Sequence, residues 1–122
     1  MPAFGRAYGK ISFTPKMNIV ILITCANKRQ AERIAGKLVK QKLVACVNII
    51  DKIKSIFWWE KKIDSATEVL LVAKSKKSLV HRIVMQVKSL HSYQVPEVIA
   101  LPIVAGNRDY INWINESIRQ SS

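Results

Sequence analysis

The sequence lacks the features that mark secreted and membrane-spanning proteins. It has only two cysteines, Cys25 and Cys46, which are too few for the disulfide framework of a small secreted domain. We therefore expect a reducing, cytoplasmic setting. No apolar run approaches the roughly 20 residues that a membrane-spanning helix needs, so no membrane span is expected. The 122 residues fit one domain, and an apolar fraction of 49% suffices for a hydrophobic core.

Signatures of covalent catalysis and of nucleotide binding are also missing. The sequence contains no GxSxG nucleophile elbow, no P-loop, no GxGxxG turn and no CxxC pair. These absences remove the common routes by which a small domain activates a nucleophile or cradles a phosphate. We expect a binding protein rather than an enzyme.

Acidic residues are scarce, since eight Asp and Glu face 20 Lys and Arg and leave a net charge of +12. Such an excess indicates either an anionic partner or only a well-solvated surface. The aromatic pattern of RNA-binding sheets (K/R-G-F/Y-G/A-F-V-x-F/Y) is absent, so no nucleic-acid partner is expected. A solvated face is our interpretation of the basic residues at positions 28, 29, 33, 37 and 40.

The chain divides into two parts. Residues 1–16 contain two glycines, two prolines, three basic residues and no acid, without helical or strand periodicity. We interpret them as a basic, flexible N-terminal extension. Residues 17–122 form the predicted domain and carry most of the positive charge.

Regular elements follow one another through that domain. A run of branched aliphatic residues at 19–23, mostly β-branched, predicts an inner strand, and Asn27 with Gln30 predicts a capped helix whose apolar stripe follows. Residues 43–59 predict one long strand bent near 51–52, which turns near 60–62 into a strand over 67–73. A second amphipathic helix over 79–90, an edge strand over 98–104 and a short closing helix complete the domain.

This order predicts an α+β, ferredoxin-like βαββαβ fold with an extra C-terminal helix. Its antiparallel sheet has helices on one face only, so the other face needs cover. Phe57, Trp58 and Trp59 lie on a strand too long for one small sheet to bury. We therefore expect an oligomer in which sheet packs on sheet.

Three places hold side chains suited to ligand or metal binding. His91, Tyr93 and Glu97 lie within one predicted loop, which fits either a ligand cluster or a loop held by hydrogen bonds. Cys46 fits either a small buried hydrophobic residue or a thiol ligand. Cys25 closes the first strand just before a helix, and both a buried strand end and a reactive thiol suit that place.

A series of short motifs runs along residues 18–119: Thr24, the run LVACVN at 43–48, Trp59-Glu60, EVLLVAK at 68–74, His91-x-Tyr93-x-x-Pro96-Glu97, and Gly106-Asn107 followed by Tyr110 and Trp113. In this order, the motifs resemble those of the CutA divalent-cation tolerance proteins.

The resemblance implies a homotrimer of ferredoxin-like subunits whose long hairpins grip their neighbours. It also implies binding of copper or other divalent cations and a role in the response to metal ions. An alternative is a trimeric module that binds small ligands or proteins without catalysis. Its clefts between subunits would be lined by Lys74, Tyr93 and Trp59, together with Glu97.

Two departures from the family pattern bear on these expectations. Lys61 replaces the glycine of the usual Trp-Glu-Gly-Lys turn, which costs about 1 kcal/mol if the backbone there needs a positive φ. The copper site of bacterial members uses a cysteine and a His-His pair, and the aligned positions here are Ile23, Leu90 and His91.

Only His91 therefore keeps a ligand at its family position. Cys25 lies two residues from Ile23 on the same strand face, so it is a candidate substitute. Cys46 and Glu97 are the further candidate donors. A thiolate and an imidazole suit Cu(I), which favours soft ligands.

Overall fold

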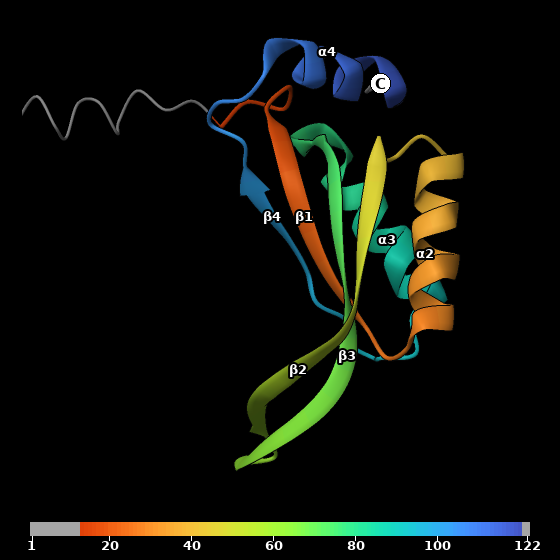
Figure 1. Ribbon diagram of the computed structural model, residues 1–122, viewed down its shortest axis with the longest axis vertical. Helices are drawn as coiled ribbons and strands as arrows, with labels where there is room; N and C mark the ends of the chain where they lie inside the picture. The colour runs from red at the N-terminus through yellow and green to blue at the C-terminus, as the bar shows by residue number, and fades with distance from the viewer. Residues whose placement is uncertain (1–12, 121–122) are drawn as a thin grey trace, which may run out of the picture.

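The computed structural model describes residues 13–120, which form a four-stranded antiparallel sheet with helices on one face (Figure 1). The strand order is β2-β3-β1-β4, as in the predicted ferredoxin-like fold. In chain order the elements are β1 (Asn18–Cys25), α2 (Lys28–Lys40), β2 (Cys46–Trp59), β3 (Lys62–Lys76), the 3₁₀ turn η1 (Lys77–Leu79), α3 (Val80–Leu90), β4 (Val98–Pro102) and α4 (Arg108–Ser117).

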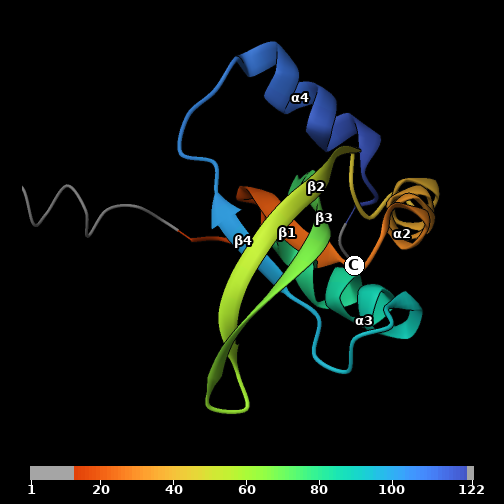
Figure 2. The same ribbon diagram turned by 60° about the horizontal axis from the view of Figure 1, so that its bottom comes forward.

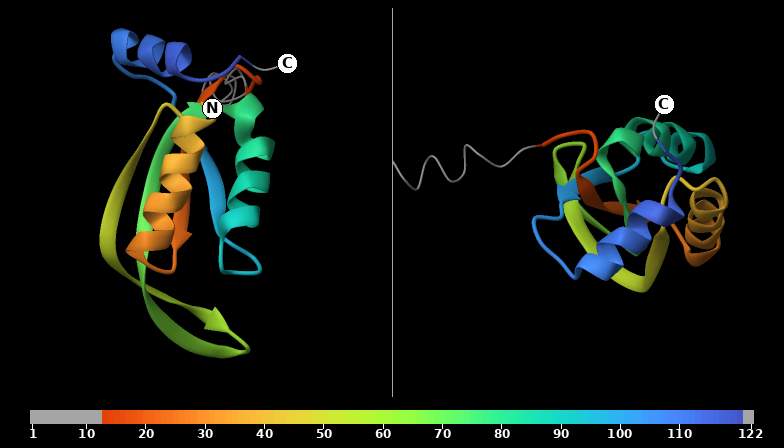
Figure 3. Two further views of the ribbon diagram at one scale, coloured as in Figure 1. Left: turned by 90° about the vertical axis from the view of Figure 1, so that its right-hand side faces the viewer. Right: turned by 90° about the horizontal axis from the view of Figure 1, so that it is seen from above.

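The core lies between the sheet and the pair of helices. Alternate residues of β1 point toward the helices, and Ile21 and Ile23 are fully buried there. The predicted stripe of α2 supplies the opposite wall with Ala31, Ile34, Ala35 and Leu38. Figure 3 shows α2 and α3 side by side over this face of the sheet, while α4 crosses one end. Burial of one face of each element fixes the layer order.

The start of α2 follows the predicted capping pattern. The backbone N–H of Gln30 donates to Oδ1 of Asn27 over 2.8 Å, and Oε1 of Gln30 accepts from the backbone N–H of Ala26 over 3.0 Å. Two backbone donors that the helix cannot satisfy are thereby paired. This cap also fixes where β1 ends and therefore where Cys25 and Thr24 lie.

Some predicted bounds were wrong. β2 begins at Cys46 rather than at 43, because Lys42 takes a left-handed φ of 56° and Leu43 donates its N–H back to the carbonyl of Leu38. β3 spans Lys62–Lys76 rather than 67–73, because pairing with β2 continues to the hairpin turn. β4 stops at Pro102 and lies at the sheet edge, where a proline is tolerated.

The segment before β1 contacts the turn that precedes α3. The carbonyls of Pro15 and Met17 accept hydrogen bonds from the backbone N–H groups of Ser78 and Lys77. Of the predicted N-terminal extension, residues 1–12 lie outside the described residues.

The predicted bend in β2 is a β-bulge between Ile50 and Ile53, where the register with β3 shifts and Lys52 has a φ of 59°. Beyond the bulge, β2 and β3 continue as a two-stranded hairpin that projects from the sheet (Figures 1 and 2). An extra residue at a bulge changes which face each later side chain takes. The bulge therefore decides which hairpin residues face the helix side.

Cross-strand pairing shows that both faces of the hairpin are apolar. Ile56 and Trp58 lie on the same face as Ile63, and these three side chains are 70%, 72% and 68% exposed. Phe57 and Trp59 point to the opposite face and are also exposed. A soluble single subunit would leave this apolar surface in water.

The turn itself contains two residues in the left-handed region, Glu60 with φ 50° and Lys61 with φ 64°. A two-residue turn with positive φ at both positions matches the twist of the hairpin and usually carries glycine at its second residue. We expect Lys61→Gly to stabilise the protein by about 1 kcal/mol, because glycine has no Cβ to strain there. A higher urea midpoint at unchanged m-value would show it.

The matched control is Lys62→Gly, one residue later in the extended strand. Glycine weakens a strand, so this change should lower the midpoint. If both substitutions shift the midpoint in the same direction, the turn carries no backbone strain of this kind.

Candidate functional site

The candidate site lies where β1 ends beside the loop between α3 and β4. His91 directly follows α3, and its Nε2 lies 2.7 Å from the backbone carbonyl of Thr24. Its Nδ1 accepts the backbone N–H of Tyr93 over 3.0 Å. A carbonyl only accepts, so these partners assign the neutral imidazole with its proton on Nε2. Both ring nitrogens are thereby used to hold the loop.

Tyr93 connects that loop to β3. Its hydroxyl donates to Oε2 of Glu68 over 2.8 Å, and its ring packs on that of His91 with the centroids 4.6 Å apart. Glu68 is buried, with 8% of its surface exposed. A buried carboxylate needs hydrogen-bond donors, and Tyr93 provides one here. Sequence reasoning gave Glu68 no role in the site, since its only signal was one carboxylate beside the apolar run at 69–73.

A further side-chain contact joins the loop to α2. Nε2 of Gln30 donates to Oγ of Ser92 over 2.8 Å, while the same side chain completes the helix cap. Three elements, β1, α2 and β3, therefore fix the loop that carries His91 and Tyr93.

Cys25 belongs to the core beside this cluster and is fully buried. Burial, with a smaller effect from the charge of Glu68, raises the pKa of the Cys25 thiol from 9.0 to about 11. Burial and the hydrogen bond to Glu68 likewise raise the pKa of Tyr93 from 10.0 to about 12. At neutral pH both groups therefore keep their protons.

The raised thiol pKa predicts a loss of stability in alkali. Below about pH 9 the thiol is protonated in both the folded and the unfolded chain, so its full contribution to stability is present. Between about pH 9 and pH 11 the unfolded thiol ionises first, and the free energy of unfolding should fall by on the order of 2 kcal/mol. Urea titrations at pH 8 and pH 10.5 measure this fall.

The control is Cys25→Ala, which removes the titrating group. This variant should lose less stability over that interval than the unchanged protein, while Cys46→Ala should lose as much. An equal fall in all three proteins would assign the alkaline loss to other groups.

The structure places the other candidate residues apart from this cluster. Cys46 pairs opposite Lys74 and contacts the Tyr110 hydroxyl of α4, with Sγ and oxygen 3.5 Å apart. Lys74 donates from Nζ to Oδ1 of Asn48. Trp59 lies at the hairpin tip opposite Lys62, and Glu97 is exposed. One subunit therefore brings Cys25, His91 and Tyr93 together but leaves Cys46, Lys74 and Trp59 elsewhere.

Within a single subunit, a metal ion could bind at this site only by displacing existing protons and hydrogen bonds. Among residues 13–120, no three or more His, Cys, Asp and Glu side chains form a group that could hold an ion. Ile23, at the family's cysteine position, is fully buried in the core, and Leu90 packs against that core. His91 and Cys25 supply the right donor types, yet both hold protons or hydrogen bonds that a metal would displace.

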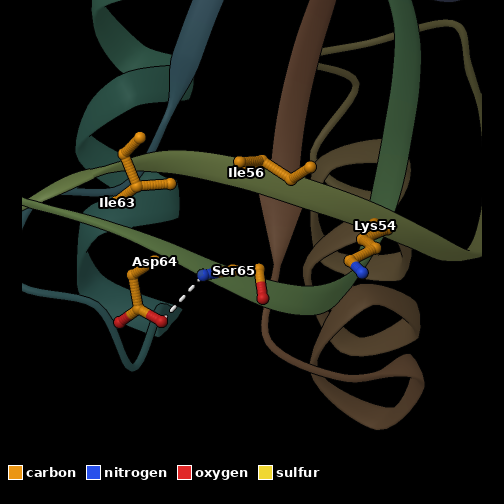
Figure 4. A pocket seen from close by; sticks show the side chains of 5 residues that line it. All are labelled: Lys54, Ile56, Ile63, Asp64 and Ser65. Carbon is orange, nitrogen blue, oxygen red and sulfur yellow. Dashed lines mark hydrogen bonds between the residues drawn. The ribbon is translucent and has the colours of Figure 1, made fainter.

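The hairpin carries a shallow hollow that, unlike the buried surroundings of Cys25, is open and partly apolar. It encloses about 260 Å³ and is lined by Lys54, Ile56, Ile63, Asp64 and Ser65 (Figure 4). The backbone N–H of Ser65 donates to Oδ1 of Asp64 over 2.7 Å, the dashed line in Figure 4. Such an open surface suits contact with another polypeptide better than enclosure of a small molecule.

No helix within residues 13–120 has the length and apolar character needed to cross a membrane.

Comparison with known proteins agrees with this architecture. The profile of the CutA1 divalent ion tolerance protein family matches residues 19–117. The chain is 45% identical over 104 residues to the chloroplastic protein CutA 1 of Oryza sativa, covering 85% of this chain and 59% of that relative. It is also 42% identical to the divalent-cation tolerance protein CutA of Archaeoglobus fulgidus, covering 84% of this chain and 99% of that one.

Solved structures give the same result. The crystal structure of CutA1 from Oryza sativa superposes with a TM-score of 0.84 at 45% identity, covering 86% of this chain and 96% of that one. The divalent cation tolerance protein of Thermus thermophilus gives a TM-score of 0.83 at 40% identity, with coverages of 84% and 100%. The chain spans about three fifths of the length of the rice relative.

Proposed function

Because this chain belongs to the CutA1 divalent ion tolerance family, we propose that it acts as a cytoplasmic homotrimer that binds copper or another divalent cation. Its role is in the response to metal ions, and no catalytic step is part of the proposal. The two cysteines are unpaired, which supports a reducing compartment.

The homotrimer proposal rests on the apolar surface that a single subunit leaves exposed on its hairpin and on β4. Both faces of the hairpin are apolar, and Ile99 and Leu101 on β4 are each 49% exposed. These β4 residues pair opposite Leu22 and Val20, whose side chains lie on the sheet face away from α2 and α3. Packing subunits through this face and the hairpins would remove a continuous apolar surface from water.

The metal proposal rests on His91 and Cys25, which the fold places at the same end of β1. A soft cation such as Cu(I) prefers their two donor types. His91 would bind through the Nδ1 lone pair that now accepts the Tyr93 N–H, and Cys25 would bind as a thiolate. Since the pKa of Cys25 is about 11, protons compete with the metal and affinity should rise with pH. Cys46 and Glu97 remain further candidate donors.

Copper titration of the purified protein tests this proposal. Cu(I) and Cu(II) are titrated separately into the unchanged protein, His91→Ala, Cys25→Ser and Cys46→Ser. The matched control is His81→Ala, because His81 is an exposed histidine on α3. We expect copper binding to fall in His91→Ala and in Cys25→Ser and to persist in His81→Ala. Equal binding in the His91 and His81 variants, or none in the unchanged protein, would refute a site at His91.

A second function is favoured by the polar side chains on the sheet face that the trimer would enclose. Lys74, Asn48 and Cys46 lie there, with Tyr110 of α4 beside them. Together with Tyr93 and Trp59 of neighbouring subunits, they would line clefts suited to a small anionic ligand or a protein segment. A thermal-shift screen with anionic metabolites tests this alternative, and a flat response across the panel would remove it.

A further inference from the structure

The outer surface of α2 has a charge pattern that the metal proposal does not use. Arg29, Arg33, Lys37 and Lys40 are spaced four, four and three residues apart, which places them on one stripe along the helix. All four side chains are exposed. Thirteen residues of helix extend about 20 Å, so the stripe runs from the first turn of α2 to its last.

These cations are not balanced by nearby acids. Glu32 is the single acidic residue of α2, and the adjacent helix α3 contains none. Within residues 13–120 the structure shows no ion pair for any of the four stripe residues. Like charges three and four positions apart repel one another and weaken a helix, and basic residues in its first turn oppose the helix dipole. A bound anionic surface would offset both effects.

The stripe lies on a layer of two neighbouring helices. α2 and α3 lie side by side on the sheet, as the left view of Figure 3 shows, and α2 rests on the sheet along its length. Lys88 adds a cation on α3, while Met85 and Val39 are exposed apolar side chains on this surface. It lies opposite the sheet face that we place inside the trimer, so assembly leaves it accessible.

We propose that the face formed by α2 and α3 binds anionic membrane surfaces, through contacts between the Arg29–Arg33–Lys37–Lys40 stripe and lipid headgroups. A stripe of exposed basic residues along the outer side of a helix complements the negatively charged surface of such a bilayer. The apolar side of α2 is buried in the core, so attachment is electrostatic and peripheral rather than by helix insertion.

Nucleic acid fits this face less well. Neither helix contains a Phe, Tyr or Trp residue on which a base could stack. Neither end of α2 projects from the sheet as a helix must to enter the major groove. Binding of duplex DNA in preference to vesicles is therefore an outcome that would overturn the proposal.

Vesicle sedimentation of the full chain tests the inference. Vesicles of phosphatidylcholine with about one third phosphatidylserine are compared with pure phosphatidylcholine vesicles at low salt and at 0.5 M NaCl. Each Lys or Arg near an anionic surface contributes about a fivefold gain in affinity, so Arg33→Gln with Lys37→Gln should weaken binding by about 30-fold. High salt should abolish binding, because the Debye length falls to about 4 Å.

The matched control is Lys16→Gln with Arg108→Gln, which removes the same charge from exposed positions outside the two helices. It should bind almost as well as the unchanged protein, and solution mass and circular dichroism confirm that both variants fold. Absence of binding to the anionic vesicles would overturn the proposal. Equal weakening in both variants, or binding to pure phosphatidylcholine, would also overturn it. Copper binding is measured separately, so either proposal can fail alone.

Discussion

Replacing Ile56 and Trp58 with glutamate is expected to convert the proposed trimer into monomers. Both side chains lie on one face of the projecting hairpin and are 70% and 72% exposed in the single subunit. Burial of a tryptophan removes 150–250 Å² from water, whereas two buried, unpaired carboxylates are strongly unfavourable. Light scattering should show about three times the 13.8 kDa subunit mass before the change and the subunit mass after it.

The matched control places the same charges on the two helices, away from the hairpin. Val39 on α2 and Met85 on α3 are also exposed apolar residues, at 42% and 55%. Because they lie away from the hairpin and the open sheet face, Val39→Glu with Met85→Glu should leave the solution mass unchanged. A trimer that survives the hairpin substitutions would show that another surface holds the subunits together, and so would dissociation by the control pair.

The arrangement of strands and helices was predictable because most elements carry a local signal. The capping pair Asn27 and Gln30, the apolar stripe of α2 and the β-branched run of β1 each indicate one structure only. The order of elements then restricts the topology, and the antiparallel sheet follows. The turn at Glu60 and Lys61 was also placed correctly, since charged residues interrupt two apolar strands there.

The faces of the hairpin could not be derived in the same way. A strand alternates with a period of two, but a bulge adds one residue and inverts the alternation beyond it. Asp51 and Lys52 indicated only that the strand bends. Which of Phe57 and Trp58 faces the helix side depends on the register after the bulge, and this needs the pairing with β3.

The candidate site was predictable only in part for a related reason. His91 and Tyr93 were visible as neighbours in one loop, but their partners Thr24 and Glu68 are far away in sequence. Spacing along the chain carries no information about such contacts. The fold brings them together because β1 and β3 are adjacent strands and the α3–β4 loop closes over their ends. The use of both His91 nitrogens therefore emerged only from the structure.

Tyr93→Phe is expected to destabilise the protein by about 2 to 3 kcal/mol. The substitution keeps the ring that packs on His91 but removes the hydroxyl that donates to Glu68. The carboxylate then stays buried without this donor, and hydrogen bonds to charged groups contribute about 1.5–3 kcal/mol. Urea denaturation measures the change, at one fixed protomer concentration because assembly shifts apparent stability.

A matched control and a double substitution separate loss of this hydrogen bond from loss of any tyrosine hydroxyl. Tyr110→Phe removes a hydroxyl that is more exposed and contacts the Cys46 thiol, so its cost should stay below about 0.5 kcal/mol. Glu68→Gln in the Tyr93→Phe background replaces the buried charge with a neutral amide and should recover part of the loss. If the two phenylalanine variants unfold at the same urea concentration, the buried Glu68 carboxylate is not stabilised by the Tyr93 hydroxyl. The loop would then be held by the contacts of His91 and Gln30 alone.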